Sequence, residues 1–144
     1  DKCSGWKVSA TDQSEAALEV ATHNAKTTKT NIEFRHGSWF EAVPDQCFDL
    51  IISNPPYVQT NDPHLEGLQF EPIEALVSGA DGLQDIRLII NRAPRQLNSK
   101  GYLLLEHGYD QQTEIMRLMR QSFTDVRGFQ DNNGIDRAVL GRKK

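Results

Sequence analysis

The sequence Asp49-Leu50-Ile51-Ile52-Ser53-Asn54-Pro55-Pro56-Tyr57 predicts a buried strand that ends at a rigid polar turn. Its apolar run, residues 50–52, is typical of a strand covered on both faces of a sheet. Pro55 and Pro56 end the strand because neither has a backbone N–H to donate. Ligands of open α/β sheets bind at the carboxyl ends of the strands. We therefore expect a ligand site at this turn.

The turn offers hydrogen-bond acceptors beside a flat aromatic face. Asn54 has a side-chain carbonyl and an amide group, and Pro55 and Pro56 contribute carbonyls without donors. A planar substrate with an –NH2 group fits this set, because its N–H bonds could point at the Asn54 and Pro55 oxygens while it stacks on Tyr57. A proline-rich loop without a ligand is the alternative that these four residues leave open.

Several motifs, taken in order, give the chain a resemblance to a known family. Asn54-Pro55-Pro56-Tyr57 after an apolar strand resembles the motif of S-adenosylmethionine-dependent methyltransferases that modify planar amino groups, in DNA adenine or in protein glutamine. The following motifs resemble the HemK/PrmC family, the glutamine-N5 methyltransferases of peptide chain release factors. They are Asp62-Pro63-His64-Leu65, Phe70-Glu71-Pro72 with Ala75-Leu76-Val77, and Leu103-Leu104-Leu105-Glu106-His107-Gly108. The resemblance covers nearly the whole chain.

This resemblance implies an α/β fold of the Rossmann-like methyltransferase type, with a mainly parallel sheet and an antiparallel C-terminal hairpin. It implies methyl transfer from S-adenosylmethionine to the side-chain amide of a glutamine in the Gly-Gly-Gln loop of a release factor. The turn at residues 54–57 would hold that amide and act in catalysis, and Asn54 would also contact the cofactor. Glu71 is a further expected substrate-binding residue. The reaction requires no metal.

Asp12 is the first expected cofactor contact outside the turn. It follows a short predicted strand, Trp6 to Thr11, and an acid at such a strand end accepts hydrogen bonds from ribose hydroxyls in nucleotide-binding folds. The alternative is that Asp12 only helps to cap the helix that begins at Ser14.

Trp39 is the second expected cofactor contact. It follows the predicted strand Asn31 to His36, and in the family this loop lies beside the adenine ring. Packing in the core is the alternative for Trp39. Many relatives have an acid where this chain has Ser38, so the role of Ser38 stays open.

The remaining elements follow from apolar periodicity and turn residues. His107, at the end of a predicted strand, could be catalytic in principle, but a structural role is favoured because no Ser or Cys partner is evident in the sequence. The expected elements are helices at Ser14–Ala25, Gly82–Leu97 (kinked or ended by Pro94) and Gln111–Ser122, a turn at Asn98–Gly101, a strand at Tyr102–Glu106, strands Asp125–Gln130 and Arg137–Leu140 joined by Asp131–Gly134, and a long irregular lid at Val58–Pro72.

Composition is that of an ordinary single domain of 144 residues. No apolar run approaches a membrane span, no signal segment opens the chain, and we expect a cytoplasmic protein. The net charge of −4 disfavours a nucleic-acid surface. Cys3 and Cys47 form neither a disulfide framework nor a metal-binding spacing, and the four histidines are scattered.

A glycine-rich loop after a first strand, which methyltransferases of this type use to bind the cofactor, is missing from the sequence. The missing strand would lie between the Val8 strand and the Leu50 strand. We therefore expect residues 1–144 to be a partial catalytic domain from a longer protein, not competent by itself. A nucleic-acid amino methyltransferase and a non-catalytic binding module remain as alternatives.

Overall fold

The computed structural model of the protein describes residues 5–68 and 70–144, and it divides into two compact units, Asp1–Gln46 and Cys47–Lys144. Cys3 lies outside the described residues, and Cys47 is free and exposed. Within the described residues, no helix is both long and apolar enough to cross a lipid bilayer.

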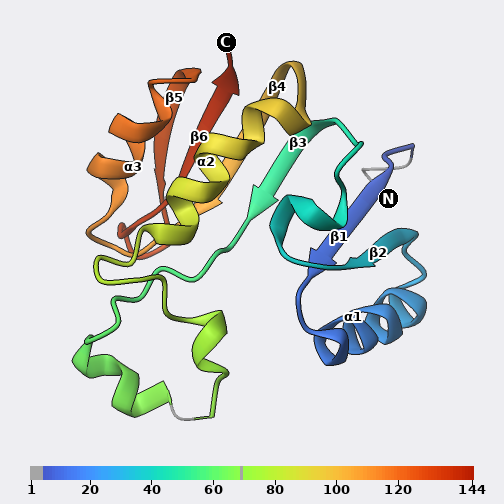
Figure 1. The fold of residues 1–144 in the computed structure, drawn as a ribbon, viewed down its shortest axis with the longest axis horizontal. Coiled ribbons are helices and arrows are strands. Elements are labelled where there is room, and N and C mark those ends of the chain that lie inside the picture. Colours follow the sequence, from blue (N-terminus) through green and yellow to red (C-terminus); the bar gives the residue numbers. More distant parts are fainter. Residues whose placement is uncertain (1–4, 69) are drawn as a thin grey trace. The chain divides into compact units, whose positions relative to one another are not determined.

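The first unit is a parallel strand pair joined by a helix (Figure 1). Its elements are β1 (Val8–Asp12), α1 (Glu15–Thr28), β2 (Ile32–His36) and the 3-10 helix η1 (Trp39–Ala42). β1 and β2 run parallel, with Asp12 opposite His36. The carboxyl ends of the two strands therefore lie side by side.

Helix α1 begins where the sequence predicts it and ends three residues later than expected. Ser14 caps it, because its Oγ accepts the Ala17 N–H at 3.2 Å. Lys29 ends it in the left-handed conformation, with φ 55°, and its N–H bonds back to carbonyls of the last turn. Lys29 adopts this conformation although the residue is not glycine, so the sequence carries no clear stop signal there.

The second unit is a four-stranded sheet in the order β3-β4-β6-β5. β3 and β4 are parallel, and β6 pairs antiparallel with both β4 and β5. α2 packs on β4, α3 packs on β5 and β6, and the two helices touch each other (Figure 1). The elements are β3 (Phe48–Ser53), the 3-10 helices η2 (Pro63–Leu68) and η3 (Ile73–Ala75), α2 (Gln84–Gln96), β4 (Leu97–Glu106), α3 (Gln112–Met119), β5 (Phe123–Gln130) and β6 (Asp136–Lys143).

The core of this unit forms where the helices meet the sheet. Burying one large aliphatic side chain contributes about 1.5–3 kcal/mol to the stability of the fold. One face of α2 and its N-cap residue form part of this core, since Leu83, Ile86, Ile89 and Ile90 are all buried. The strands of the sheet contribute further core residues, including Leu97, Leu103, Leu105, Phe123 and Val139.

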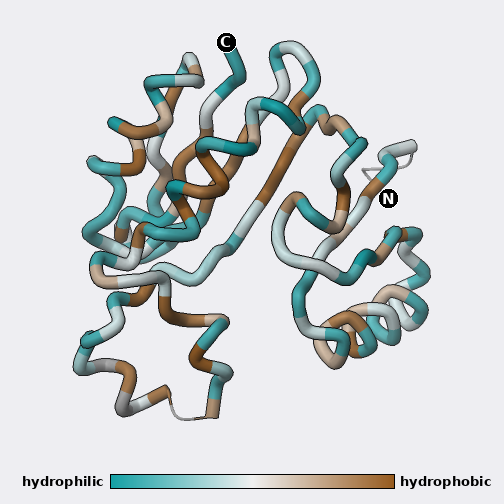
Figure 2. Tube along the Cα trace, viewed as in Figure 1, coloured by the Kyte–Doolittle hydropathy of each residue, from teal (hydrophilic) through white to brown (hydrophobic). Residues whose placement is uncertain are grey.

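Strand β3 differs from the expected fully buried strand. Figure 2 shows its hydrophobic residues, but Ile52 is 66% exposed. The reason is that β3 is an edge strand, paired only with β4 among the described strands. β1 likewise pairs only with β2. The described strands therefore form two separate sheets. The expected missing central strand stays a prediction.

Three local expectations need correction. Pro94 does not end α2, because it lies in the last turn and the helix continues to Gln96. The expected turn at residues 98–101 is instead part of β4, where the register shifts so that Phe48 opposes Leu97 and Leu50 opposes Tyr102. The expected irregular lid contains the 3-10 helix η2. The α/β class and the antiparallel C-terminal hairpin are confirmed.

Candidate active site

The turn at residues 54–57 leaves β3 directly and presents one free amide side chain. Pro55 is fully buried, Pro56 and Tyr57 are half-buried, and Asn54 is exposed. Within the described part of the chain, neither the Asn54 side chain nor the Pro55 carbonyl makes a hydrogen bond. The turn therefore keeps two oxygen acceptors available beside the Tyr57 ring.

The backbone that follows the turn is held by a second segment, residues 76–79. The Leu76 carbonyl accepts the N–H groups of Tyr57 (3.1 Å) and Val58 (2.8 Å). Val58 also forms a parallel bridge with Val77, and its carbonyl accepts the Ser78 N–H at 2.9 Å. These contacts fix the exit of the turn while the Asn54 side chain stays exposed.

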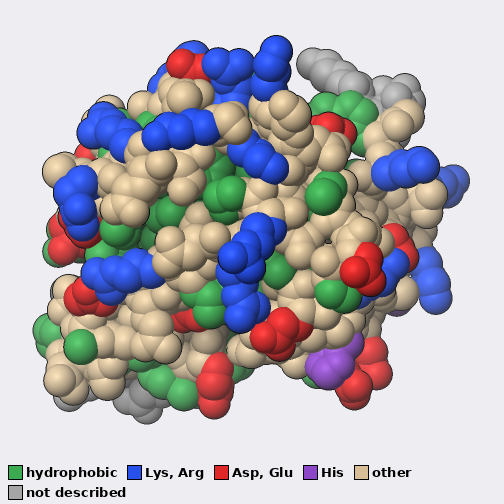
Figure 3. Space-filling view, turned by 45° about the horizontal axis from the view of Figure 1, so that its top comes forward, with side chains coloured by type: hydrophobic (Ala, Val, Ile, Leu, Met, Phe, Trp, Pro, Cys, Tyr) green, Lys and Arg blue, Asp and Glu red, His purple; other side chains and the backbone are tan. Residues whose placement is uncertain are grey.

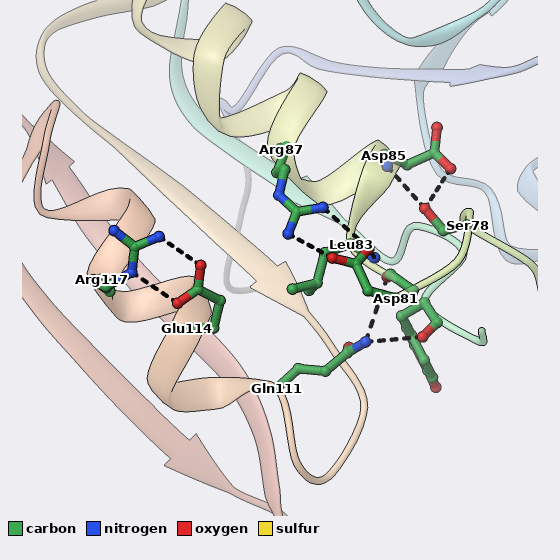
Figure 4. Close-up of polar contacts among 10 residues, drawn as sticks. Ser78, Asp81, Leu83, Asp85, Arg87, Gln111, Glu114 and Arg117 are labelled. Carbon is green, nitrogen blue, oxygen red and sulfur yellow. Dashed lines mark hydrogen bonds and ion pairs between the residues drawn. The ribbon is translucent and has the colours of Figure 1, made fainter.

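The start of α2 is held beside this segment by side-chain caps (Figure 4). Ser78 is buried, its Oγ accepts the Asp85 N–H at 2.8 Å and it donates to Asp85 Oδ2 at 2.7 Å. Asp81 accepts the Leu83 N–H and two hydrogen bonds from Arg87, at 3.0 and 2.6 Å. The hydrogen bonds from the Arg87 guanidinium hold the pKa of the Asp81 carboxyl below its usual value.

Gln111 is buried at this site, and no sequence pattern predicts a role for its side chain. Its Nε2 donates to the Tyr57 carbonyl at 3.0 Å and to the Gly82 carbonyl at 3.4 Å (Figure 4). Its Oε1 accepts the Gly108 N–H at 2.9 Å. The partners lie up to 54 positions away in the sequence, so no local pattern predicts them.

His107 lies at the carboxyl end of β4 with its side chain in the core. It is fully buried, and its Nδ1 hydrogen-bonds with the Gly108 carbonyl at 2.7 Å. Nε2 is buried without a partner in the described part of the chain. The His107 side chain is therefore enclosed by the protein, and its structural role stays a prediction.

Asp12 and Trp39 lie at the carboxyl ends of the strands of the first unit. Asp12 is exposed, and its Oδ1 accepts the Ser14 N–H at 2.8 Å, so the side chain does help to begin α1. Its Oδ2 makes no hydrogen bond within the described residues. The Asp12 carbonyl accepts the Gly37 N–H at 3.0 Å, which brings the loop after β2 to the same edge.

Trp39 opens η1 at this edge with φ 47°, a left-handed conformation that is unfavourable for a bulky residue. Its side chain is half-buried. Ser38 makes no side-chain capping bond to η1. Strained backbone of this kind is often found at ligand sites. The cofactor role expected for Trp39 stays a prediction.

Glu71 lies in the segment between η2 and η3, and its side chain is exposed. Among the described residues, no hydrogen bond or ion pair of its side chain links Glu71 to the turn. The described residues contain no cluster of three or more His, Cys, Asp or Glu side chains suited to a metal ion.

The fold and the site together define a class of protein. Residues 4–139 match the family described as "Methyltransferase domain". The chain belongs to this family. Two solved structures share the fold at low sequence identity: a methyltransferase from Pyrococcus furiosus (TM-score 0.71, 20% identity, 95% of this chain and 62% of that one) and a ribosomal protein L11 methylase from Lactobacillus delbrueckii subsp. bulgaricus (TM-score 0.67, 20% identity, 96% and 58%).

Curated relatives narrow the likeness to one kind of methyltransferase. The chain is 43% identical to the release factor glutamine methyltransferase of Coxiella burnetii over 96% of its own length and 50% of the relative. It is 44% identical to that of Pseudomonas aeruginosa over 95% and 51%. The resemblance expected from the motifs is therefore confirmed, and the chain spans about half the length of the curated relatives it matches.

Proposed function

We propose that residues 1–144 are part of the catalytic domain of an S-adenosylmethionine-dependent methyltransferase. The proposed methyl acceptor is the side-chain amide nitrogen (N5) of the glutamine in the Gly-Gly-Gln loop of a peptide chain release factor. The observation that carries this proposal is the exposed, unpartnered Asn54 amide on a turn whose exit is fixed by hydrogen bonds. The 43% identity to a release factor glutamine methyltransferase supports the same substrate.

The turn would act by positioning the substrate. An amide nitrogen is a poor nucleophile, because its lone pair is delocalised into the carbonyl, so the direction of approach matters. Asn54 Oδ1 would accept one N–H of the target amide and the Pro55 carbonyl would accept the other. The plane of the amide would then stack on Tyr57. Fixed acceptors of this kind lower the barrier through orientation and electrostatics.

The cofactor would supply a methyl group bound to a positively charged sulfur. The residues of the first unit suit a nucleoside: Asp12 Oδ2 makes no hydrogen bond within the described residues and can accept ribose hydroxyls. Trp39 offers an indole face on the loop that adjoins Asp12. Asn54 is the proposed cofactor contact from the turn, and Glu71 a further proposed contact to the protein substrate.

A release-factor substrate implies a cytoplasmic location and a protein partner. The rival substrate, a nucleic-acid base, is less well supported. The net charge is −4. Figure 3 shows Lys and Arg side chains in several separate groups on the face that it draws, without one continuous basic stripe. Nucleic-acid surfaces usually carry such a stripe.

The test is methyl transfer by the full-length protein to a release factor and to duplex DNA. We expect a labelled methyl group on the glutamine of the Gly-Gly-Gln loop, located by mass spectrometry of the product, and none on DNA. A release factor with that glutamine replaced by alanine is the control and should remain unlabelled. Label on adenine, with none on the release factor, would overturn the proposal in favour of the nucleic-acid rival.

A further inference from the structure

The side-chain amide of Gln111 joins three segments that are distant in the sequence. It binds the carbonyl of Tyr57, the carbonyl of Gly82 before α2, and the N–H of Gly108 after β4. These partners also fix the orientation of the amide, because two carbonyl oxygens require the NH2 group and one N–H requires the oxygen. Gln111 itself is only 8% exposed.

Two glycines, Gly82 and Gly108, allow the backbone to come close to the Gln111 side-chain amide. Gly82 has φ +70°, and an added Cβ there would collide with the Tyr57 carbonyl oxygen and lie 2.7 Å from Gln111 Nε2. An added Cβ on Gly108 would lie 3.1 Å from Gln111 Oε1. The space around the Gln111 amide is therefore closed on two sides, and the side chain has little freedom to move.

Tyr57 is consequently held at both ends of its backbone. Its N–H donates to the Leu76 carbonyl and its carbonyl accepts from Gln111. Gln111 does not lie within the turn, and its polar groups are all used inside the protein. Removing its NH2 group would release the Tyr57 carbonyl and leave the Tyr57 ring free to shift.

We propose that Gln111 is a positioning residue for the reaction at residues 54–57: it fixes Tyr57, and through it the plane in which the substrate amide is held. This inference rests on the proposed function for its kinetic consequence, but the effect on Tyr57 is independent of the substrate. A displacement of about 1 Å at a reacting centre can lower the rate about a hundredfold. We expect loss of the Gln111 amide to lower kcat by at least roughly tenfold, with less change in KM.

Gln111→Glu gives the sharpest test, because its effect should depend on pH. As a carboxylate, Glu would face two carbonyl oxygens and repel them. When protonated, it would again donate to the Tyr57 carbonyl and accept from Gly108. Burial beside carbonyl groups raises the pKa of such a carboxyl, so protonation falls in an accessible range. The rate of Gln111→Glu relative to the unaltered protein should therefore rise as the pH falls from about 8.5 to about 6.

The neighbouring residues His107 and Asp110 are unchanged in both proteins, so the two proteins differ only at residue 111. Gln111→Leu cannot regain the donor and should stay slow at every pH. Gln121→Glu makes the same chemical change at an exposed position and should leave the rate unchanged. All rates are measured on the full-length protein at a temperature where circular dichroism shows it folded, so that a loss of fold is not read as a loss of rate.

A second readout separates this proposal from the proposed function. With 3-fluorotyrosine incorporated, the ¹⁹F resonance of Tyr57, assigned with Tyr57→Phe, should shift in Gln111→Glu at high pH and return at low pH. It should not shift in Gln121→Glu. If the unaltered protein fails to methylate a release factor, this resonance still decides the role of Gln111. An unshifted Tyr57 resonance, or a pH-independent normal rate in Gln111→Glu, would overturn the proposal.

Discussion

Asn54 has an exposed side chain, and its backbone belongs to a turn whose next residue, Pro55, is fully buried. Asn54→Ala removes one proposed acceptor and leaves a substrate donor unpaired, which costs about 1–3 kcal/mol. It also removes one constraint on the direction in which the substrate nitrogen faces the methyl group of the cofactor. We therefore expect the single-turnover rate to fall at least roughly a hundredfold. Cofactor affinity and the melting temperature should change little.

Two further variants sharpen this prediction. Asn133→Ala removes an exposed asparagine at the hairpin turn and should leave the rate unchanged. Asn54→Asp keeps an acceptor but adds a negative charge, so it should slow turnover while favouring a cationic cofactor. The measurements are single-turnover methylation, cofactor affinity and thermal melting on the full-length protein. A folded Asn54→Ala protein with a near-normal rate would remove Asn54 from the mechanism.

The start of α2 shows how a single element positions the turn. Ser78 is buried and bonds Asp85 twice, whereas Ser14 makes the equivalent cap of α1 at an exposed position. Ser78→Ala would leave the part-buried Asp85 N–H without its partner and should lower the free energy of unfolding by about 1–3 kcal/mol. Ser14→Ala should lower it less, by about 0.5–1 kcal/mol. Urea denaturation of both variants checks this order, and equal losses would contradict the argument from burial.

Element positions were largely predictable from sequence, and the errors have local causes. Apolar spacing identifies the buried face of α2, and the strand-then-proline pattern identifies the Asn54 turn. Pro94 misleads because the proline removes one hydrogen bond of the helix, yet the buried face of α2 keeps the helix formed as far as Gln96. The role of Gln111 was not predictable, because its three hydrogen bonds depend on where Tyr57, Gly82 and Gly108 meet after folding.

For the molecule as a whole, the sequence contains no glycine-rich loop after a first strand, and the described strands form two separate sheets. β1 and β3 each have one unpaired edge within the described residues. Unpaired edges expose a row of N–H and C=O groups that a further strand could bond. The lack of a glycine-rich loop can be read from the sequence, because glycine spacing is a local signal, whereas the exposure of Ile52 depends on which strands pair in the sheet.

Cofactor binding should be weak in the 144-residue chain, because it lacks a glycine-rich loop. The proposed contacts of the 144-residue chain are Asp12, Trp39 and Asn54, and the sequence provides no glycine-rich loop to bring backbone N–H groups to the cofactor. We expect the 144-residue chain to bind S-adenosylmethionine at least about tenfold more weakly than the full-length protein. Titration calorimetry on both forms measures the difference.

Asp12→Asn serves as the matched probe in the full-length protein. The amide keeps one oxygen for the Ser14 N–H, so α1 should form normally, but it loses the charge that favours two ribose hydroxyls. Affinity for the cofactor should fall while the melting temperature of the unbound protein stays within a few degrees. Equal affinity of the short chain and the full-length protein, together with an unaffected Asp12→Asn variant, would place the cofactor away from the ends of β1 and β2.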